Sequence, residues 1–246
     1  MPIVLGIDPG LNITGYGVLE VAAGGPVDLG ARIVAEALTR KFGQSFVVEN
    51  KTGANGAIAA EAVKTSPADG YTILISNAST MTTNHLLYKD IKYDPLVDLT
   101  PVALVVSAPF ILVVNPESPK TKSVATFADF VALAKSKPDL INYGSGGVGN
   151  LAHLSSELLA VTIGARMVHV PYAGAAPAQA ALLSGEVDAV FDVPQAVPLI
   201  KAGRLKALAV STPLRWRDLP DVPTVAESGY SSFATSFWTG VIAPAK

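Results

Sequence analysis

The 246-residue sequence contains no cysteine, only three histidines and two tryptophans, and little net charge, at -2. Without cysteine there is no disulfide, thiolate nucleophile or cysteine-ligated metal site, which fits an oxidising or a reducing compartment. No run of lysine or arginine marks a surface for phosphate backbones, so nucleic acid is not an expected partner. No apolar run approaches the roughly 18 to 20 residues that span a bilayer, and the N-terminus does not have the pattern of a signal peptide.

Apolar residues make up half of the sequence and charged residues 15%, which is typical of a compact α/β protein and not of a disordered chain. Strand-like runs alternate with helix-like segments from about residue 14 to 242, a pattern that predicts βαβ units with a largely parallel sheet. The expected helices cover residues 27–42, 57–63, 126–136, 151–161 and 177–184. The expected strands cover residues 45–49, 71–76, 141–143, 167–170, 187–191 and 207–211.

Two segments interrupt this alternation. Prolines cluster around residues 92–108 and again around 213–240, which indicates two crossings of the chain between lobes. The sequence therefore predicts four parts, which are a discordant start at 1–21, a first lobe at 22–103, a second lobe at 104–212, and a return crossing to the first lobe at 213–246.

Four expected loops before helices are rich in Gly, Ala, Ser and Asn and nearly free of charge, namely 22–28, 76–80, 144–150 and 172–177. The carboxyl ends of parallel strands line the ligand crevice in open α/β sheets, and the N-termini of the following helices present free N–H groups. Any one of these loops could be a plain tight turn. Together they predict a site that holds a carboxylate through neutral dipoles.

Other kinds of chemistry find little support in the sequence. Gly144, Gly146 and Gly149 match the spacing of the dinucleotide fingerprint, but the next expected strand lacks the acidic residue that binds the ribose. No nucleophile elbow, Walker lysine or His-Glu-x-x-His motif is present. His153 either faces a ligand or caps and packs, and Asp192 either receives a ligand hydroxyl or amino group or caps the next helix.

From residue 22 onward the sequence resembles the receptors of tripartite tricarboxylate transporters, also called Bug proteins. The matching segments are AAGGPVD at 22–28, VENKTGA at 48–54, PADGYT at 67–72, NYGSGG at 142–147, HVPYAG at 169–174 and GEVDA at 185–189. The resemblance implies a two-lobed α/β fold of the type II periplasmic-binding kind and a periplasmic, monomeric protein that is not an enzyme and needs no cofactor. It also implies a small carboxylate as ligand and membrane transporter subunits as partners.

Both ends of the chain depart from that family. Residues 1–10, MPIVLGIDPG, and 14–18, TGYGV, resemble the start of the Holliday-junction resolvase RuvC, in which the position of Asp8 holds a catalytic metal ion. One carboxylate cannot hold two metal ions, and the other acidic motifs of that family are not found. A metal-dependent junction endonuclease is thus the alternative function, and a strand within 13–21 or 3–7 is expected to replace the first strand of the receptor family. Since that family continues past residue 244 with helices that cover the first lobe, the resemblance also implies a truncated C-terminus.

These observations give one hypothesis for the site, with no catalytic residue and no metal ion. A carboxylate is expected between the loops at 22–28 and 144–150. The first lobe is expected to contribute Ala23, Gly24, Asn77, Ser79 and Thr80. The second lobe is expected to contribute Ser145, Gly146, Gly147, Asn150, Ala173 and Asp192.

Overall fold

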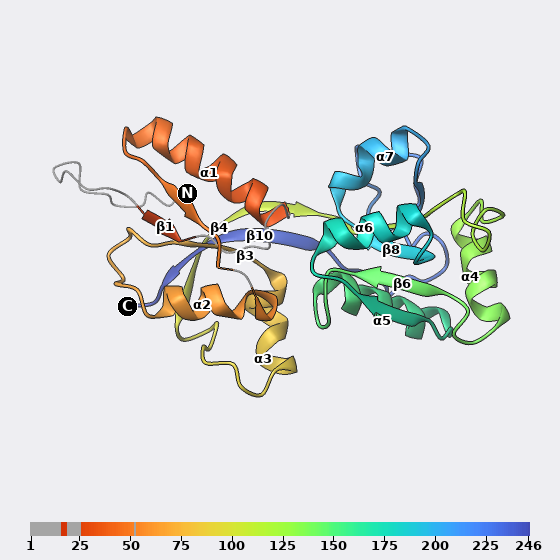
Figure 1. The fold of residues 1–246 in the computed structure, drawn as a ribbon, viewed down its shortest axis with the longest axis horizontal. Coiled ribbons are helices and arrows are strands. Elements are labelled where there is room, and N and C mark those ends of the chain that lie inside the picture. The colour runs from red at the N-terminus through yellow and green to blue at the C-terminus, as the bar shows by residue number, and fades with distance from the viewer. Residues whose placement is uncertain (1–15, 19–25, 52) are drawn as a thin grey trace. The chain divides into compact units, whose positions relative to one another are not determined.

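The computed structural model describes residues 16–18, 26–51 and 53–246. The chain divides into two units, which are Met1–Val105 with Thr239–Lys246, and Val106–Trp238 (Figure 1). Three residues named from the sequence, Asp8, Ala23 and Gly24, lie outside the described residues. Both units combine sheets with helices, so the predicted α/β class is confirmed.

The first unit, unit 1, contains two small sheets. Strand β1 (Tyr16–Val18) pairs in parallel with β2 (Val47–Glu49), and β1 lies within the segment 13–21 that was expected to supply a strand. The second sheet has the order β3-β10-β4, with β10 antiparallel to β3. Its strands are β3 (Leu74–Asn77), β10 (Phe237–Pro244) and β4 (Leu99–Ala108).

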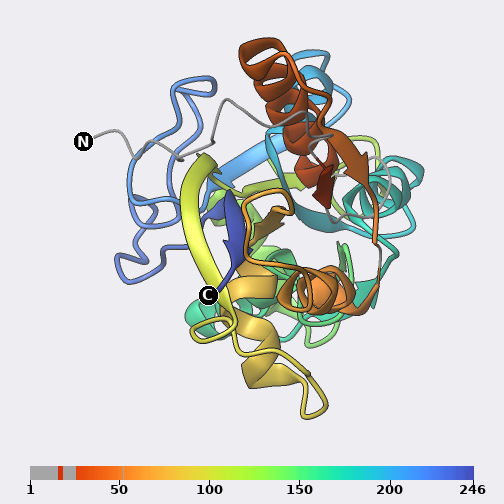
Figure 2. The same ribbon diagram turned by 90° about the vertical axis from the view of Figure 1, so that its left-hand side faces the viewer.

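Helices α1 (Pro26–Phe42) and α2 (Ala57–Lys64) lie on opposite faces of this second sheet (Figures 1 and 2). Asp28 in the first turn of α1 and basic residues in its last turn stabilise the helix, because their charges are opposite to those of the helix dipole at each end. The remaining helical turns of unit 1 are η1 (Ala54–Gly56), η2 (Ser79–Thr83) and α3 (Asn84–Leu87).

The second unit, unit 2, is built on one sheet of five strands in the order β7-β6-β8-β5-β9. Strand β6 pairs in parallel with β7 on one side and with β8 on the other, whereas β5 runs antiparallel to β8 and β9. The strands are β5 (Ile111–Val114), β6 (Asn142–Ser145), β7 (Val168–Pro171), β8 (Ala189–Asp192) and β9 (Lys206–Val210). The helices are α4 (Phe127–Ser136), α5 (Leu151–Ile163), α6 (Ala175–Ser184), η3 (Pro194–Ala196) and α7 (Val197–Lys201).

Both faces of the unit 2 sheet are buried. Along β5, Leu112 and Val114 pack into one apolar cluster with α4 and α5, while Ile111 and Val113 pack into another with α6 and α7. This alternation follows from the two-residue period of a strand. Burial on both faces holds the strand ends, and hence the loops that follow them, in fixed positions.

The chain returns to unit 1 later in the sequence than the predicted start of the second crossing. The sequence assigned all of 213–246 to a return crossing, whereas 213–238 lie in unit 2 and only 239–246 in unit 1. The reason is apolar burial, since Leu219 packs into one core cluster of unit 2 and Val225 and Phe233 pack into the other.

Two strands, β4 and β10, went unrecognised in the proline-rich segments. Most side chains of the ten-residue β4 are exposed, so its sequence carries no alternation of buried and exposed positions. It contains Pro101, a residue that sheets accept at an edge strand, and β4 is an edge of its sheet in the part of the chain that the structure describes. No helix among the described residues is long and apolar enough to cross a bilayer.

Candidate functional site

Three parallel strands of unit 2 end at the same edge of its sheet. Strand β6 ends at Ser145, which pairs with Pro171 at the end of β7, and β8 ends at Asp192. The loops that follow β6 and β7 lead directly into α5 and α6. The structure thus brings the second-lobe residues of the hypothesis to one edge, where the N-termini of two helices also lie.

The loop after β6 packs closely against the start of α6. A methyl group placed on Gly146 would lie 3.1 Å from the backbone nitrogen of Ala175 and 3.1 Å from the carbonyl carbon of Gly174. Gly174 precedes α6 with a φ of 125°, and no side chain caps this helix. Because α6 has no acidic residue in its first turn, the positive end of its dipole is not neutralised by its own side chains.

The same loop opens α5. Gly147 and Gly149 have φ values of 134° and 77°, which side chains rarely adopt, so the loop depends on glycine at both positions. Asn150 caps α5, since its Oδ1 accepts a hydrogen bond of 3.0 Å from the backbone nitrogen of His153. Asn150 therefore has a structural task beside the ligand contact proposed from the sequence.

Ser145 is engaged within the protein. Its side chain is buried, and its Oγ accepts from the Gly147 nitrogen at 3.2 Å and donates to the Gly147 oxygen at 3.0 Å. The same Oγ lies 2.7 Å from Nε2 of His169. The hydroxyl thus fixes the glycine-rich loop at Gly147.

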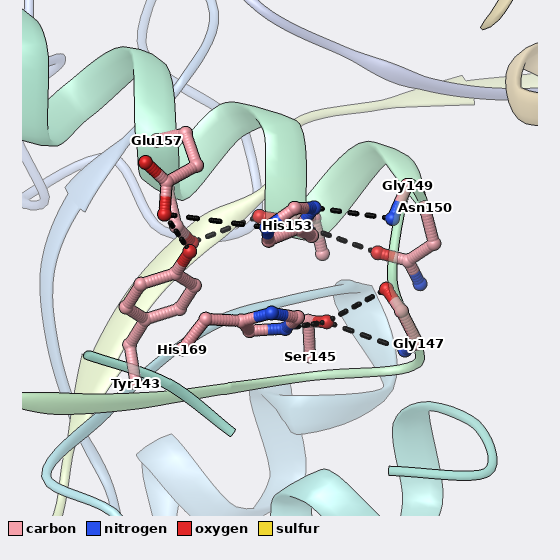
Figure 3. Close-up of polar contacts among 10 residues, drawn as sticks. Tyr143, Ser145, Gly147, Gly149, Asn150, His153, Glu157 and His169 are labelled. Carbon is pink, nitrogen blue, oxygen red and sulfur yellow. Dashed lines mark hydrogen bonds and ion pairs between the residues drawn. The ribbon is translucent and has the colours of Figure 1, made fainter. Parts of the chain in front are cut away.

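Two histidines from different elements stack beside the loop (Figure 3). The ring centroids of His153 and His169 lie 3.9 Å apart with an interplanar angle of 25°, and Tyr143 stacks on His169 at 5.1 Å. Nδ1 of His153 accepts a hydrogen bond of 3.1 Å from the Gly149 nitrogen. His153 was a candidate from the sequence, but the pair was not predicted. The parallel pairing of β6 with β7 sets Tyr143 opposite His169, whereas His153 reaches the stack from α5.

The surroundings of the stack keep both imidazoles neutral. Burial lowers the pKa of His169 to about 4, helped by the neighbouring His153. Burial also lowers the pKa of His153, while Glu157, whose Oε1 lies 4.0 Å from Nε2 of His153, acts in the opposite direction. Burial, together with a hydrogen bond from the Tyr143 hydroxyl to Glu157, raises the pKa of Tyr143.

Asp192 is a buried carboxylate with local partners. Its Oδ1 accepts from the Val193 nitrogen at 2.8 Å, and its Oδ2 accepts from Nε2 of Gln179 at 2.7 Å. Burial raises the pKa of this carboxyl. Val193 is the N-cap residue of η3, and no side chain caps this helix, so the bond from the Val193 nitrogen does not make Asp192 a helix cap. Ala173 lies exposed in the loop before α6.

In unit 1, the described candidate residues lie together where β3 ends. Oδ1 of Asn77 accepts from the Ser79 nitrogen at 2.9 Å, and both Ser79 and Thr80 are buried. Oγ1 of Thr80 donates to the Asn55 oxygen at 3.4 Å, and the Thr80 carbonyl accepts from the Tyr93 hydroxyl at 2.7 Å. These polar groups are therefore used in large part to fold the turn.

No group of three or more His, Cys, Asp or Glu side chains within the described part of the chain is arranged to hold a metal ion. Asp8, the residue of the nuclease alternative, lies outside that part.

Comparisons with known proteins agree with one another. Residues 30–246 match the model of the family described as "Tripartite tricarboxylate transporter family receptor". Protein BugT of Bordetella pertussis is 37% identical over 92% of this chain and 69% of its own length. An Agrobacterium vitis protein is 36% identical, and the chain spans 64% of its length, so the chain amounts to about two thirds of these curated relatives.

Solved structures give the same result. The fold matches that of an R. palustris protein solved with adipate, with a TM-score of 0.87 and 38% identity over 94% of this chain and 76% of the other. It also matches MatC from Rhodopseudomonas palustris with bound malate, with a TM-score of 0.83 and 32% identity over 94% of this chain and 78% of the other.

Proposed function

This chain belongs to the tripartite tricarboxylate transporter receptor family, and on this premise we propose that it captures a small carboxylate and delivers it to membrane transporter subunits. The family is one of solute-binding receptors and not of enzymes. We propose that the protein is periplasmic, because two related structures are those of a periplasmic transporter and of the periplasmic binding protein BugD, and we expect it to act as a monomer without a cofactor.

The observation that carries the proposal is the contact between the glycine-rich loop and the uncapped start of α6. Gly146 lies so near α6 that a methyl group added to it would be 3.1 Å from the Ala175 nitrogen, where helix N–H groups point out of the helix end. An acid group is attracted there by the helix dipole and by neutral N–H donors. Because no full positive charge is needed, the ligand can also be released, as delivery to a transporter requires.

The ligand contacts that we propose follow from this position. In unit 2, backbone groups of Gly146 and Gly147, the side-chain amide of Asn150, and Ala173 take part directly, while Ser145 shapes the loop. Asp192 accepts a hydroxyl or amino group of the ligand. In unit 1, the proposed residues are those predicted from the sequence, Ala23, Gly24, Asn77, Ser79 and Thr80.

The test is a binding screen of the purified chain. Adipate, malate, citrate and acetate are added in turn, and thermal unfolding is followed by calorimetry. A ligand at about 100 times its Kd is expected to raise Tm by about 5 to 10 °C. The diamide of adipic acid serves as a matched control, because it has the same length without the charge.

Two results would contradict the proposal. If none of the four acids raised Tm or gave heat in titration calorimetry, the carboxylate-binding function would be wrong. If adipate and its diamide stabilised the chain equally, recognition would not depend on an acid group, and the site at the start of α6 would have to be abandoned.

A further inference from the structure

The hydrogen bond between Gly149 and His153 defines the protonation state of the imidazole. A backbone N–H can only donate, so Nδ1 of His153, which lies 3.1 Å from the Gly149 nitrogen, must carry a lone pair. The proton of the neutral ring is then on Nε2, which faces Oε1 of Glu157 at 4.0 Å. In a protonated ring, Nδ1 would carry a hydrogen directed at the hydrogen of Gly149, and this contact would be lost.

We propose that His153 is a positioning residue for the carboxylate site, and that its neutral imidazole holds Gly149 and thereby the glycine-rich loop at 146–150 in the form that binds the ligand. This inference rests on the proposed function, because it concerns the same loop. It adds a residue that does not touch the ligand and a dependence of binding on pH.

The charged and titratable neighbours of His153 come from three elements. Glu157 lies one turn further along α5, His169 stacks from β7 at 3.9 Å, and Tyr143 lies on β6 with its ring centroid 6.3 Å away. Burial lowers the pKa of His153, whereas Glu157 acts in the opposite direction and favours protonation. His153 in turn helps to lower the pKa of the stacked His169, so that His169 stays neutral when His153 gains a proton. Neutral His153 therefore prevails near neutral pH, and acid shifts it to the charged form.

His169 differs from His153 in this respect. Its Nε2 contacts a hydroxyl, Ser145 Oγ, which can donate or accept. When His169 gains a proton, Ser145 can direct its own hydrogen to the Gly147 oxygen, 3.0 Å away, and keep both contacts. The loop should thus tolerate protonation of His169 better than that of His153.

Two substitutions separate the role of the acceptor from that of the ring. In His153→Asn, the side-chain Oδ1 stands as many bonds from the backbone as Nδ1 does, and it cannot take up a proton in this pH range. His153→Leu fills similar space without an acceptor. His85→Asn, at an exposed histidine in α3, is the control for a change of histidine elsewhere.

Binding of adipate and malate is measured by calorimetry between about pH 7.5 and pH 5. At pH 7.5 we expect the Leu variant to bind about five- to tenfold more weakly than the wild type, the scale of one hydrogen bond, and the Asn variant to bind nearly as well. Toward pH 5 the wild type should lose affinity relative to the Asn variant. The ratio of the two affinities does not depend on protonation of the ligand itself, because that effect is common to both proteins.

Equal affinities of the wild type and the Leu variant would overturn the inference, as would parallel pH profiles of the wild type and the Asn variant. If the wild type bound none of the four acids of the binding screen, the proposed function would fail instead, and the inference would be judged without ligand. For that purpose the amide signal of Gly149 is followed by NMR as His153 titrates. A shift that the Asn variant lacks supports the inference, and an unmoved signal refutes it.

Discussion

Gly146 and Ala175 approach so closely that a methyl group on Gly146 would stand 3.1 Å from the Ala175 nitrogen. The loop after β6 and the start of α6 therefore share one surface, and only a residue without a side chain permits it. The proposed acid group lies on this surface, so a side chain that fills the space next to Gly146 tests the site directly.

Gly146→Ala is expected to weaken binding of adipate or malate at least about tenfold, because the neighbours of the new methyl group are backbone atoms and the amide of Asn150 at 2.8 Å. Titration calorimetry gives the affinity. Gly30→Ala in α1 is the matched control, since nothing lies within 4 Å of its added methyl group and alanine favours the helix. Equal affinity of the Gly146 variant and the control would place the ligand elsewhere.

Gly147 is less informative. Its φ of 134° is strained for any side chain, although a methyl group there would be 3.7 Å from the nearest atom, the Tyr172 oxygen. Gly147→Val is still expected to abolish binding, but by distorting the backbone and not only by filling the space for an acid group. Its circular dichroism and Tm must therefore be measured beside the affinity.

Two substitutions of Asn150 separate its role in folding from its proposed role in binding. Asn150→Ala removes the cap of α5 and should cost about 1 kcal/mol of unfolding free energy, measured by urea denaturation. Asn150→Asp keeps a capping oxygen and should retain most of that stability, yet it brings a negative charge beside the proposed acid group and should lose carboxylate binding. An Asp variant that binds like the wild type would remove Asn150 from the site.

Thr126 supplies the control for this pair. It caps α4 in a box with Asp129, as the sequence predicts from the spacing of the two residues. Thr126→Ala should cost a similar amount of unfolding free energy to Asn150→Ala. Because α4 does not follow β6 or β7, the folded Thr126 variant should bind its ligand unchanged, which separates loss of a cap from loss of a contact.

The sequence predicted most helices of unit 2 within two residues, because capping residues and helical spacing are local signals. The box at Thr126 and the start of α5 at Leu151 are examples. Strands β4 and β10 were not predicted, since they pair with each other across more than a hundred residues, which leaves no local trace. Most side chains of β4 are exposed and those of β10 are largely buried, so neither strand shows a simple alternation.

The candidate site was predicted in part. The glycine-rich loop was found because unusual backbone angles require glycine, and Gly147 and Gly149 have such angles. The stack of His153 on His169 was not found, because it depends on how α5 packs beside β7, which no local pattern shows. Sequence also could not tell that the Ser145 hydroxyl would bond within its own loop.

Asp188, from the segment GEVDA, has a structural role that the resemblance alone did not give. Its Oδ2 accepts from the Asn142 nitrogen at 2.8 Å and from Nζ of Lys120 at 2.9 Å, and its side chain is only 4% exposed. Asp188→Ala should lose about 2 to 3 kcal/mol of unfolding free energy, because a charge-assisted bond is broken and a donor is left buried. Asp188→Asn retains an acceptor for Asn142 and should lose at most about 1 kcal/mol, since Lys120 is half exposed. Urea unfolding that ranked the two variants in the opposite order would contradict this role.

His169 should make the folded protein sensitive to acid. Its pKa is about 4 in the folded chain and 6.5 in a free side chain, so the unfolded state binds more protons between these values. The contribution of His169 to the free energy of unfolding is then fully present above about pH 6.5 and is lost as the pH drops toward 4. His169→Gln retains a polar atom for Ser145 but binds no proton, so its urea midpoint should fall less than that of the wild type between about pH 7 and pH 4.5. The lowered pKa of His153 acts in the same direction, and a variant that also carries His153→Asn should be the least sensitive of the three. Equal acid losses in all three proteins would mean that carboxyl groups elsewhere, and not this stack, determine the response to pH.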